Sequence, residues 1–134
     1  MKVEDVRFLD LDCFSENDGN LVPIELEKKI PFDVKRIFYV FGVKDKQIRG
    51  KHAHHQTQQV LICVSGECVV ICKDGKSEKK VNLDSPTKAL YIPEMIWDEQ
   101  IYMTDNTVLL VLSSTEYSKK DYIEDYQKFQ NLKG

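Results

Sequence analysis

The sequence predicts a mainly β protein, an antiparallel sandwich or barrel with one helix at its C-terminal end. Between residues 36 and 113, short apolar stretches alternate with turn residues, and no helical period lies between them. Near the C-terminus the period changes, and apolar residues recur at the spacing of a helix. Strands that follow one another in this way favour antiparallel pairing in a two-layer or closed architecture.

The predicted strands are short and bounded by turns. Ser65-Gly66 is typical of a tight hairpin and Asp74-Gly75 of the next turn. In the segment 67–73 both faces are apolar, so we expect a covering element or a second subunit to bury the face that a two-layer roll leaves open. The predicted strands span residues 36–43, 58–64, 67–73, 77–83, 88–94, 96–103 and 107–114.

We predict one amphipathic helix over residues 119–131, packed on the roll. Ser118 followed by Asp121 resembles an N-terminal capping box. The residues at helical spacing are Tyr122, Ile123, Tyr126 and Phe129.

Length and composition favour one domain, residues 1–134, in the cytoplasm. The chain has 134 residues, no apolar run near the roughly 20 residues that span a bilayer, and no signal peptide in its first ten residues. The net charge of −3 argues against nucleic acid as a partner.

The four cysteines form no C-x-x-C pair, so we expect reduced, buried thiols. Residues 35–51 are strongly basic. This segment is either a solvated face or a docking site for an anionic small molecule.

All three histidines lie in one polar segment, "RGKHAHHQTQQ", residues 49–59. On a strand, residues two apart share a face, so His52 and His54 point together and His55 points away. Two imidazoles that face one cavity can serve either metal ligation or proton transfer. His55 is expected at the surface.

The H-x-H pattern at the start of a roll of short strands resembles the cupins. A metal-binding cupin adds a glutamate four or five positions on and a later histidine. Here Gln58 or Gln59 takes the glutamate position, no histidine follows His55, and Asp98 follows Trp97 in the matching later segment. Because an amide is a poor ligand for zinc or iron, we predict a site without a metal.

The longer pattern is more specific. "FDVKRIFYVFGV", "RGKHAHHQTQQVLICVSGECVV", "LDSPTKALYIPEMIWDEQ" and "DYIEDYQKF" together resemble the sugar 3,4-ketoisomerase family, over residues 18–130. These are metal-free cupins that act on thymidine-diphosphate-4-keto-6-deoxyglucose. The resemblance implies a cupin-type jelly roll, an intracellular homodimer, no cofactor and a nucleotide-linked sugar as substrate. It also implies that an aminotransferase uses the product to make 3-amino-3,6-dideoxyhexoses for surface polysaccharides.

The resemblance also implies roles for individual residues. The paired catalytic histidines match His52 and His54, and further site residues match Arg36, Tyr39 and Arg49. Many relatives carry a histidine where this chain has Asp98.

The reaction moves a ketone from C4 to C3 through an enediol, which an imidazole can catalyse near neutral pH. We take His52 as the principal base and His54 as the relay, although the sequence does not separate the two roles. Gln59 joins the arginines and Tyr39 as a candidate donor to the enediolate. Tyr91 and Trp97 either stack on the substrate or belong to the aromatic core.

Three alternatives stay open from the sequence. The first is a non-catalytic cupin that binds a nucleotide sugar, the second a metal-dependent cupin oxygenase or isomerase, and the third a 3,5-epimerase. The stereochemistry of the product at C4 is also left open.

Overall fold

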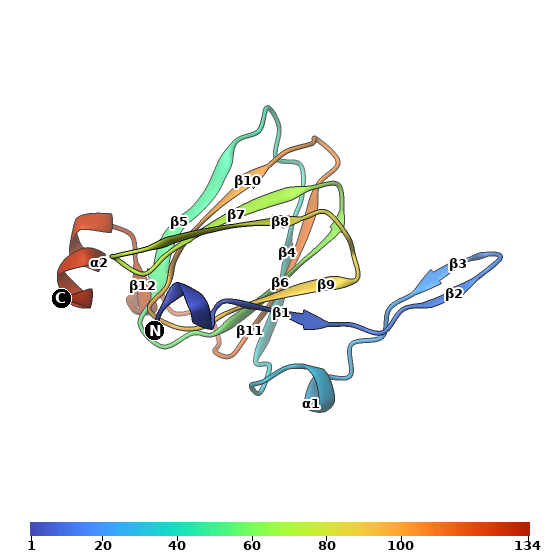
Figure 1. The fold of residues 1–134 in the computed structure, drawn as a ribbon, viewed down its shortest axis with the longest axis horizontal. Coiled ribbons are helices and arrows are strands. Elements are labelled where there is room, and N and C mark those ends of the chain that lie inside the picture. Colours follow the sequence, from blue (N-terminus) through green and yellow to red (C-terminus); the bar gives the residue numbers. More distant parts are fainter.

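The computed structural model describes residues 1–134 and contains two five-stranded antiparallel sheets packed face to face (Figure 1). In order, the first sheet contains β1 (Arg7–Asp10), β9 (Lys88–Ile92), β6 (Gln59–Ser65), β11 (Val108–Ser113) and β4 (Arg36–Val40). The second contains β12 (Tyr122–Ile123), β5 (Ile48–His54), β10 (Trp97–Tyr102), β7 (Cys68–Lys73) and β8 (Glu78–Leu83). This confirms the predicted cupin-type jelly roll, in the form of a sandwich.

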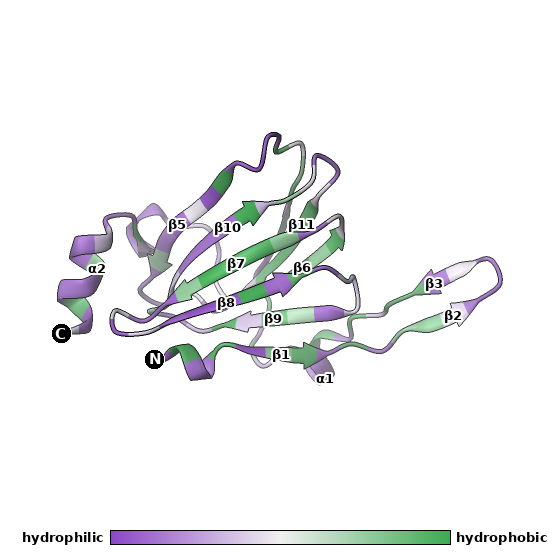
Figure 2. Cartoon of the chain, turned by 45° about the horizontal axis from the view of Figure 1, so that its top comes forward, coloured by the Kyte–Doolittle hydropathy of each residue, from purple (hydrophilic) through white to green (hydrophobic).

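The main core lies between the two sheets. On β7, which is hydrophobic along most of its length in Figure 2, Cys68, Val70 and Cys72 are fully buried and face Leu61 and Leu90 of the opposite sheet. All four cysteines are free; Cys63, Cys68 and Cys72 are buried as predicted, whereas Cys13 is exposed, contrary to the prediction. Burial raises the pKa of the Cys68 thiol to about 12, so it is an inert part of the core.

The chain itself covers the outer face of the first sheet. The segment 22–34, which contains the short helix α1 (Leu26–Lys29), packs Ile30 against Val60, Ile62 and Leu112. This smaller core was not foreseen, since the segment has no clear period.

The C-terminal helix is shorter than predicted. Residues 119–121 form a 3-10 turn, β12 pairs with the edge of β5, and only Tyr126–Lys133 form the helix α2. Asp125, whose carboxylate accepts from two backbone N–H groups, caps α2, whereas Ser118 makes no side-chain cap. The helical spacing led to a helix that was predicted too long. Ile123 and Phe129 do belong to one apolar cluster, but Ile123 lies on the strand β12 and Phe129 on the helix α2.

A two-stranded arm extends away from the sandwich (Figure 1). Its strands, β2 (Phe14–Glu16) and β3 (Gly19–Leu21), pair only with each other and are exposed throughout. A 3-10 turn at Val3–Asp5 precedes β1. No helix in the molecule has the length and apolar character that a bilayer crossing requires.

Candidate active site

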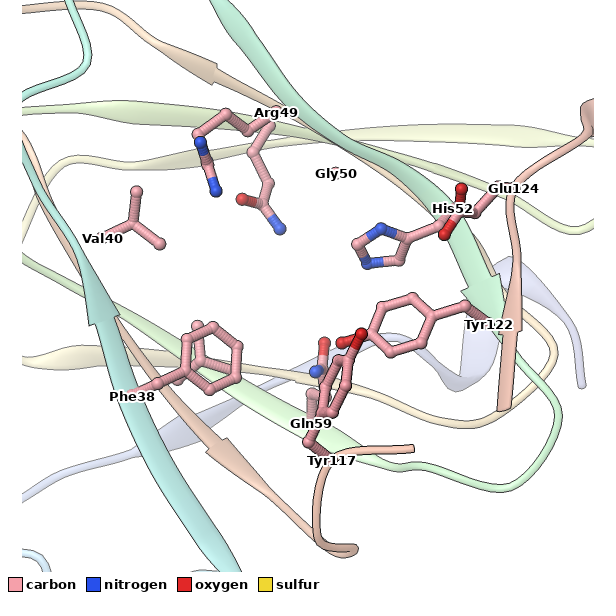
Figure 3. A pocket seen from close by; sticks show the side chains of 11 residues that line it. Phe38, Val40, Arg49, Gly50, His52, Gln59, Tyr117, Tyr122 and Glu124 are labelled. Atoms are coloured by element: carbon pink, nitrogen blue, oxygen red, sulfur yellow. The ribbon is translucent and has the colours of Figure 1, made fainter. Parts of the chain in front are cut away.

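A cavity of about 290 Å³ lies between the sheets, where β4 faces β5 (Figure 3). It receives side chains from both sheets and from the segment between β11 and α2. The lining residues are Phe38, Val40, Arg49, Gly50, His52, Gln59, Gln100, Val111, Tyr117, Tyr122 and Glu124.

A bulge in β5 brings Arg49 and His52 to the same cavity. Residues three apart on a regular strand face opposite sides. Here His52 pairs with Asp98 and Gly50 with Glu99, so β5 holds one more residue than β10 at this point. The extra residue returns His52 to the inner face, so that His52 and Arg49 both line the cavity (Figure 3).

Glycine is required at this bulge. Gly50 has a φ of +84°, and the next residue, Lys51, has a φ of +58°. A Cβ on Gly50 would also lie 3.1 Å from both the carbonyl oxygen and Oδ1 of Asp98. The R-G-x-H pattern is thus explained by backbone geometry, because it places a guanidinium and an imidazole on the same face of the strand.

The two histidines lie at different depths. His52 is half-buried in the cavity wall, whereas His54 is 4% exposed and lies behind it. Their ring centroids are 5.0 Å apart, and the Tyr122 ring lies 5.0 Å from His52 and 4.4 Å from His54. We had expected both imidazoles to look into the cavity; in the structure only His52 does. His55 is exposed, as expected.

The carboxylate of Asp121 contacts the imidazole of His54 on the side away from the cavity. The Nδ1 of His54 lies 2.9 Å from Oδ2 of Asp121. The same carboxylate accepts from the backbone N–H of Gln56 at 2.7 Å and from the Thr57 hydroxyl. Burial alone would raise the pKa of Asp121, but these hydrogen bonds outweigh it and lower that pKa. Asp121 is therefore an anion at neutral pH.

His54 itself is uncharged at neutral pH. Burial, reinforced by the neighbouring His52, lowers the pKa of His54 to about 4, although Asp121 opposes this shift. Its Nε2 is buried and has no hydrogen-bond partner.

Two further predicted residues, Arg49 and Gln59, line the cavity. Gln59 donates to the hydroxyl of Ser113 at 3.2 Å, which orients its amide. The guanidinium of Arg36 lies over the rings of Phe38 and Tyr117, at 5.2 and 5.6 Å from their centroids. Arg36 thus supports two aromatic lining residues but does not line the cavity itself.

The structure does not bring Tyr39, Tyr91 or Trp97 to this cavity. On each of these strands the adjacent side chain points toward the cavity side of the sheet. Because successive side chains point to opposite faces, these three point to the outer side. Tyr39 is 64% exposed, and Tyr91 donates to the Oε1 of Gln58 beneath the covering segment. Trp97 packs on Phe129 of α2 and so belongs to an aromatic core, which was the second of the two roles predicted for it.

Sequence reasoning missed several lining residues. Phe38 could have been found, because it lies two positions from Arg36 and so shares its face. The others, Gln100, Tyr117, Tyr122 and Glu124, carried no local signal, and three of them belong to the segment around the mispredicted helix.

Asp98 does not line the cavity but is hydrogen-bonded to Gln100, which does. It is 1% exposed, and its Oδ1 accepts from the Nε2 of Gln100 at 3.1 Å. The Oε1 of Gln100 in turn accepts from the hydroxyl of Tyr102 at 3.0 Å. These bonds fix the Gln100 amide at the cavity, while burial raises the pKa of Asp98. No group of three or more His, Cys, Asp or Glu side chains is arranged to hold a metal ion.

A jelly roll with a histidine of one strand in the wall of a cavity between its sheets is typical of the cupins. The family model described as FdtA (WxcM-like, C-terminal) matches residues 4–134, and the chain belongs to this family.

Its relatives are sugar ketoisomerases. A TDP-4-oxo-6-deoxy-alpha-D-glucose-3,4-oxoisomerase from Aneurinibacillus thermoaerophilus is 41% identical over 115 residues, which cover 86% of this chain and 83% of the relative. A histidine-to-asparagine mutant of the 3,4-ketoisomerase QdtA from Thermoanaerobacterium thermosaccharolyticum, in complex with TDP-4-keto-6-deoxyglucose, is 35% identical. It superimposes with a TM-score of 0.92, covering 95% of this chain and 92% of that one.

A second ketoisomerase has the same fold over its full length. WlaRA from Campylobacter jejuni, a TDP-fucose-3,4-ketoisomerase, is 35% identical with a TM-score of 0.90, over 97% of this chain and 96% of that one. The 3'-monoepimerase ChmJ from Streptomyces bikiniensis, at 15% identity and a TM-score of 0.77 over 89% of this chain and 68% of that one, shares the fold alone.

Proposed function

We propose that this chain is a 3,4-ketoisomerase that acts on TDP-4-keto-6-deoxyglucose. Its family and the printed activities of its relatives support this assignment. The observation that carries it is His52, an imidazole in the wall of a cavity, with Arg49 at the same bulge and the uncharged His54 behind it. The alternative of a 3,5-epimerase has only a shared fold in its favour.

The reaction needs one base and one route for returning a proton. His52 removes the proton from C3, and the electrons of that C–H bond form the double bond of an enediolate between C3 and C4. His52 then returns its proton to C4, while the proton of the C3 hydroxyl passes to the C4 oxygen. The C3 oxygen becomes the ketone and the C4 oxygen a hydroxyl, so no oxidant or reductant is consumed. Acid–base catalysis by a positioned imidazole typically contributes about 10²–10⁴-fold.

The negative oxygen of the enediolate is stabilised by donors in the wall. Arg49, Gln59 and Gln100 surround the same cavity as His52, and the amides of both glutamines are oriented by hydrogen bonds. A cavity of about 290 Å³ lies at the lower end of small-molecule pockets, so it holds the hexose, and the nucleotide extends out of it.

Deuterium exchange tests the proposal. With TDP-4-keto-6-deoxyglucose in deuterated water, we expect deuterium on the sugar ring and a ketone at C3, both read by NMR. A 3,5-epimerase would leave the ketone at C4, and a non-catalytic binding protein would introduce no deuterium. Either result would overturn the assignment. We further expect turnover to continue in a chelator, and its loss there would favour the metal-dependent alternative.

The base is tested by His52→Asn. Turnover should fall by about 10²–10⁴-fold, while TDP still binds, because the substitution removes the base and keeps the shape of the wall. His55→Asn is the matched control, since His55 is exposed on the same segment. Near wild-type turnover in a folded His52→Asn variant would exclude His52 as the base.

We also propose a homodimer. On the edge strand β4, Ile37 and Tyr39 are 56% and 64% exposed, and Phe41, just after this strand, is 70% exposed. On the arm, Phe14 and Leu21 are 59% and 60% exposed. Exposed apolar residues on an edge strand and on a projecting arm mark interaction surfaces. The cytoplasmic location expected from the sequence stays a prediction.

A further inference from the structure

Asp121 reaches His54 from a distant part of the chain. The two residues are 67 positions apart, and their side chains are 12% and 5% exposed. The segment that carries Asp121 is tied to β5 by backbone pairing, because Tyr122 pairs with His54 and the N–H of His55 donates to the carbonyl of Asp121 at 2.9 Å. The carboxylate is thus placed by the sheet and not by a mobile loop.

Every partner of this carboxylate is a donor. Oδ1 accepts from the N–H of Gln56, and Oδ2 accepts from the hydroxyl of Thr57. The Thr57 hydroxyl, having given its hydrogen to Asp121, accepts from Thr115 at 2.6 Å. An ionised carboxylate can only accept, so the ring nitrogen that lies 2.9 Å from Oδ2 carries a proton.

We propose that Asp121 is a positioning residue that holds His54 as the Nδ1–H tautomer, with the lone pair of Nε2 directed to the side of His52 and Tyr122. This inference rests on the proposed function, since it concerns the second imidazole of the ketoisomerase site. It goes beyond that function by adding a third residue, outside the cavity, to the histidine pair.

The unpartnered Nε2 is the observation that points to a role in catalysis. Buried polar atoms are nearly always hydrogen-bonded, and one left without a partner calls for an explanation. Nε2 of His54 is buried and unpartnered, while the other ring nitrogen is held firmly. An acceptor kept free beside His52 can take the proton that His52 removes from the sugar. Asp121 then stabilises the imidazolium that forms on His54, until the proton returns through His52 to C4.

Asp121→Asn tests the proposal. An asparagine whose Oδ1 accepts from Gln56 turns its NH₂ group toward Nδ1, so His54 should change to the Nε2–H tautomer. We expect kcat to fall by about 10²–10⁴-fold, with TDP affinity unchanged because Asp121 does not line the cavity. Asp125→Asn is the matched control, since asparagine caps a helix as well as aspartate does and Asp125 does not contact His54.

The tautomer is read directly by ¹⁵N NMR. The chain has three histidines, so the ring nitrogens of His54 can be assigned, and the wild-type protein should show a protonated Nδ1 and an unprotonated Nε2 at neutral pH. This measurement needs no variant and no substrate. An Nε2–H tautomer in the wild type would overturn the proposal.

The two proposals fail in different ways. If the wild type isomerises the sugar and a folded Asp121→Asn variant does so at the same kcat, the positioning role is wrong and the function stands. If the wild type does not isomerise the sugar, the proposed function is wrong, and the ¹⁵N spectrum still decides whether Asp121 sets the tautomer.

Discussion

Burial shifts the pKa values of two ionisable side chains of the second sheet, His54 and Asp98, in the direction that favours the uncharged form. Burial lowers the pKa of His54 to about 4 and raises the pKa of Asp98, because a low-dielectric interior disfavours either charge. Asp121 remains ionised because hydrogen bonds compensate for its burial. The site thus combines a neutral imidazole with a fixed anion behind it, which is the arrangement that lets an imidazole accept a proton.

The lowered pKa of His54 has a consequence for stability. Between pH 6.5 and about 4 the unfolded chain binds a proton at this position and the folded chain does not, so stability falls as the pH falls through this window. We expect His54→Asn to lessen this pH dependence by at most about 3 kcal/mol. Urea unfolding over a series of pH values measures it, with the exposed His55→Asn as control. Parallel curves for the wild type and His54→Asn would contradict the buried, neutral state of His54.

At the scale of the elements, the site depends on one irregular strand. The bulge at Gly50 turns β5 so that Arg49 and His52 share a face, and the pairing of β12 with the other end of β5 supplies Tyr122. A regular strand with the same side chains would place the guanidinium and the imidazole on opposite sides of the sheet.

Gly50→Ala should therefore damage both stability and function. The positive φ costs roughly 1–2 kcal/mol with a Cβ present, and the new methyl group would press on Asp98. Gly42→Ala is the matched control, because Gly42 has a φ of +75° but open space around it. We expect both variants to lose stability by chemical denaturation, and only Gly50→Ala to lose TDP binding and turnover as well. Normal turnover in Gly50→Ala would show that the bulge does not govern the site.

At the scale of the whole molecule, a single chain leaves part of its apolar surface exposed. The chain buries the outer face of the first sheet with its own segment 22–34, but this cover stops short of the outer face of β4. The arm β2–β3 also projects away from the sandwich, and its strands pair only with each other (Figure 1). A second copy that covers both surfaces would explain why they are apolar.

Light scattering tests the dimer. We expect the wild type to be a dimer at micromolar concentration, and Tyr39→Glu to shift it toward a monomer, since a charge would be placed in an apolar interface. Leu132→Glu is the control, because Leu132 is 50% exposed on α2, away from β4. A monomeric wild type would contradict the homodimer.

Local patterns predict much of this protein. Short apolar stretches bounded by turn pairs such as Ser65-Gly66 were enough to predict strands that match β6 and β7 within a residue at each end, because strand propensity and turn conformation are properties of neighbouring residues. The family pattern, carried by four short segments between residues 18 and 130, led to the correct family.

The composition of the site was decided by tertiary contacts. The side toward which His52 points depends on a bulge that exists only in the pairing of β5 with β10, and Asp121 meets His54 across 67 positions. The segment 119–131 has helical spacing, but residues 122–123 pair with the edge strand β5. Their backbone therefore forms strand hydrogen bonds instead of a helical turn. Sequence alone therefore determined seven of the strands, the turns between them and the histidine pair, since these depend on near neighbours, whereas β1, β5, β12 and the arm were not predicted as strands. Only the tertiary structure decided which face each side chain presents and which distant residue supports it, because both depend on pairing between segments far apart in the chain.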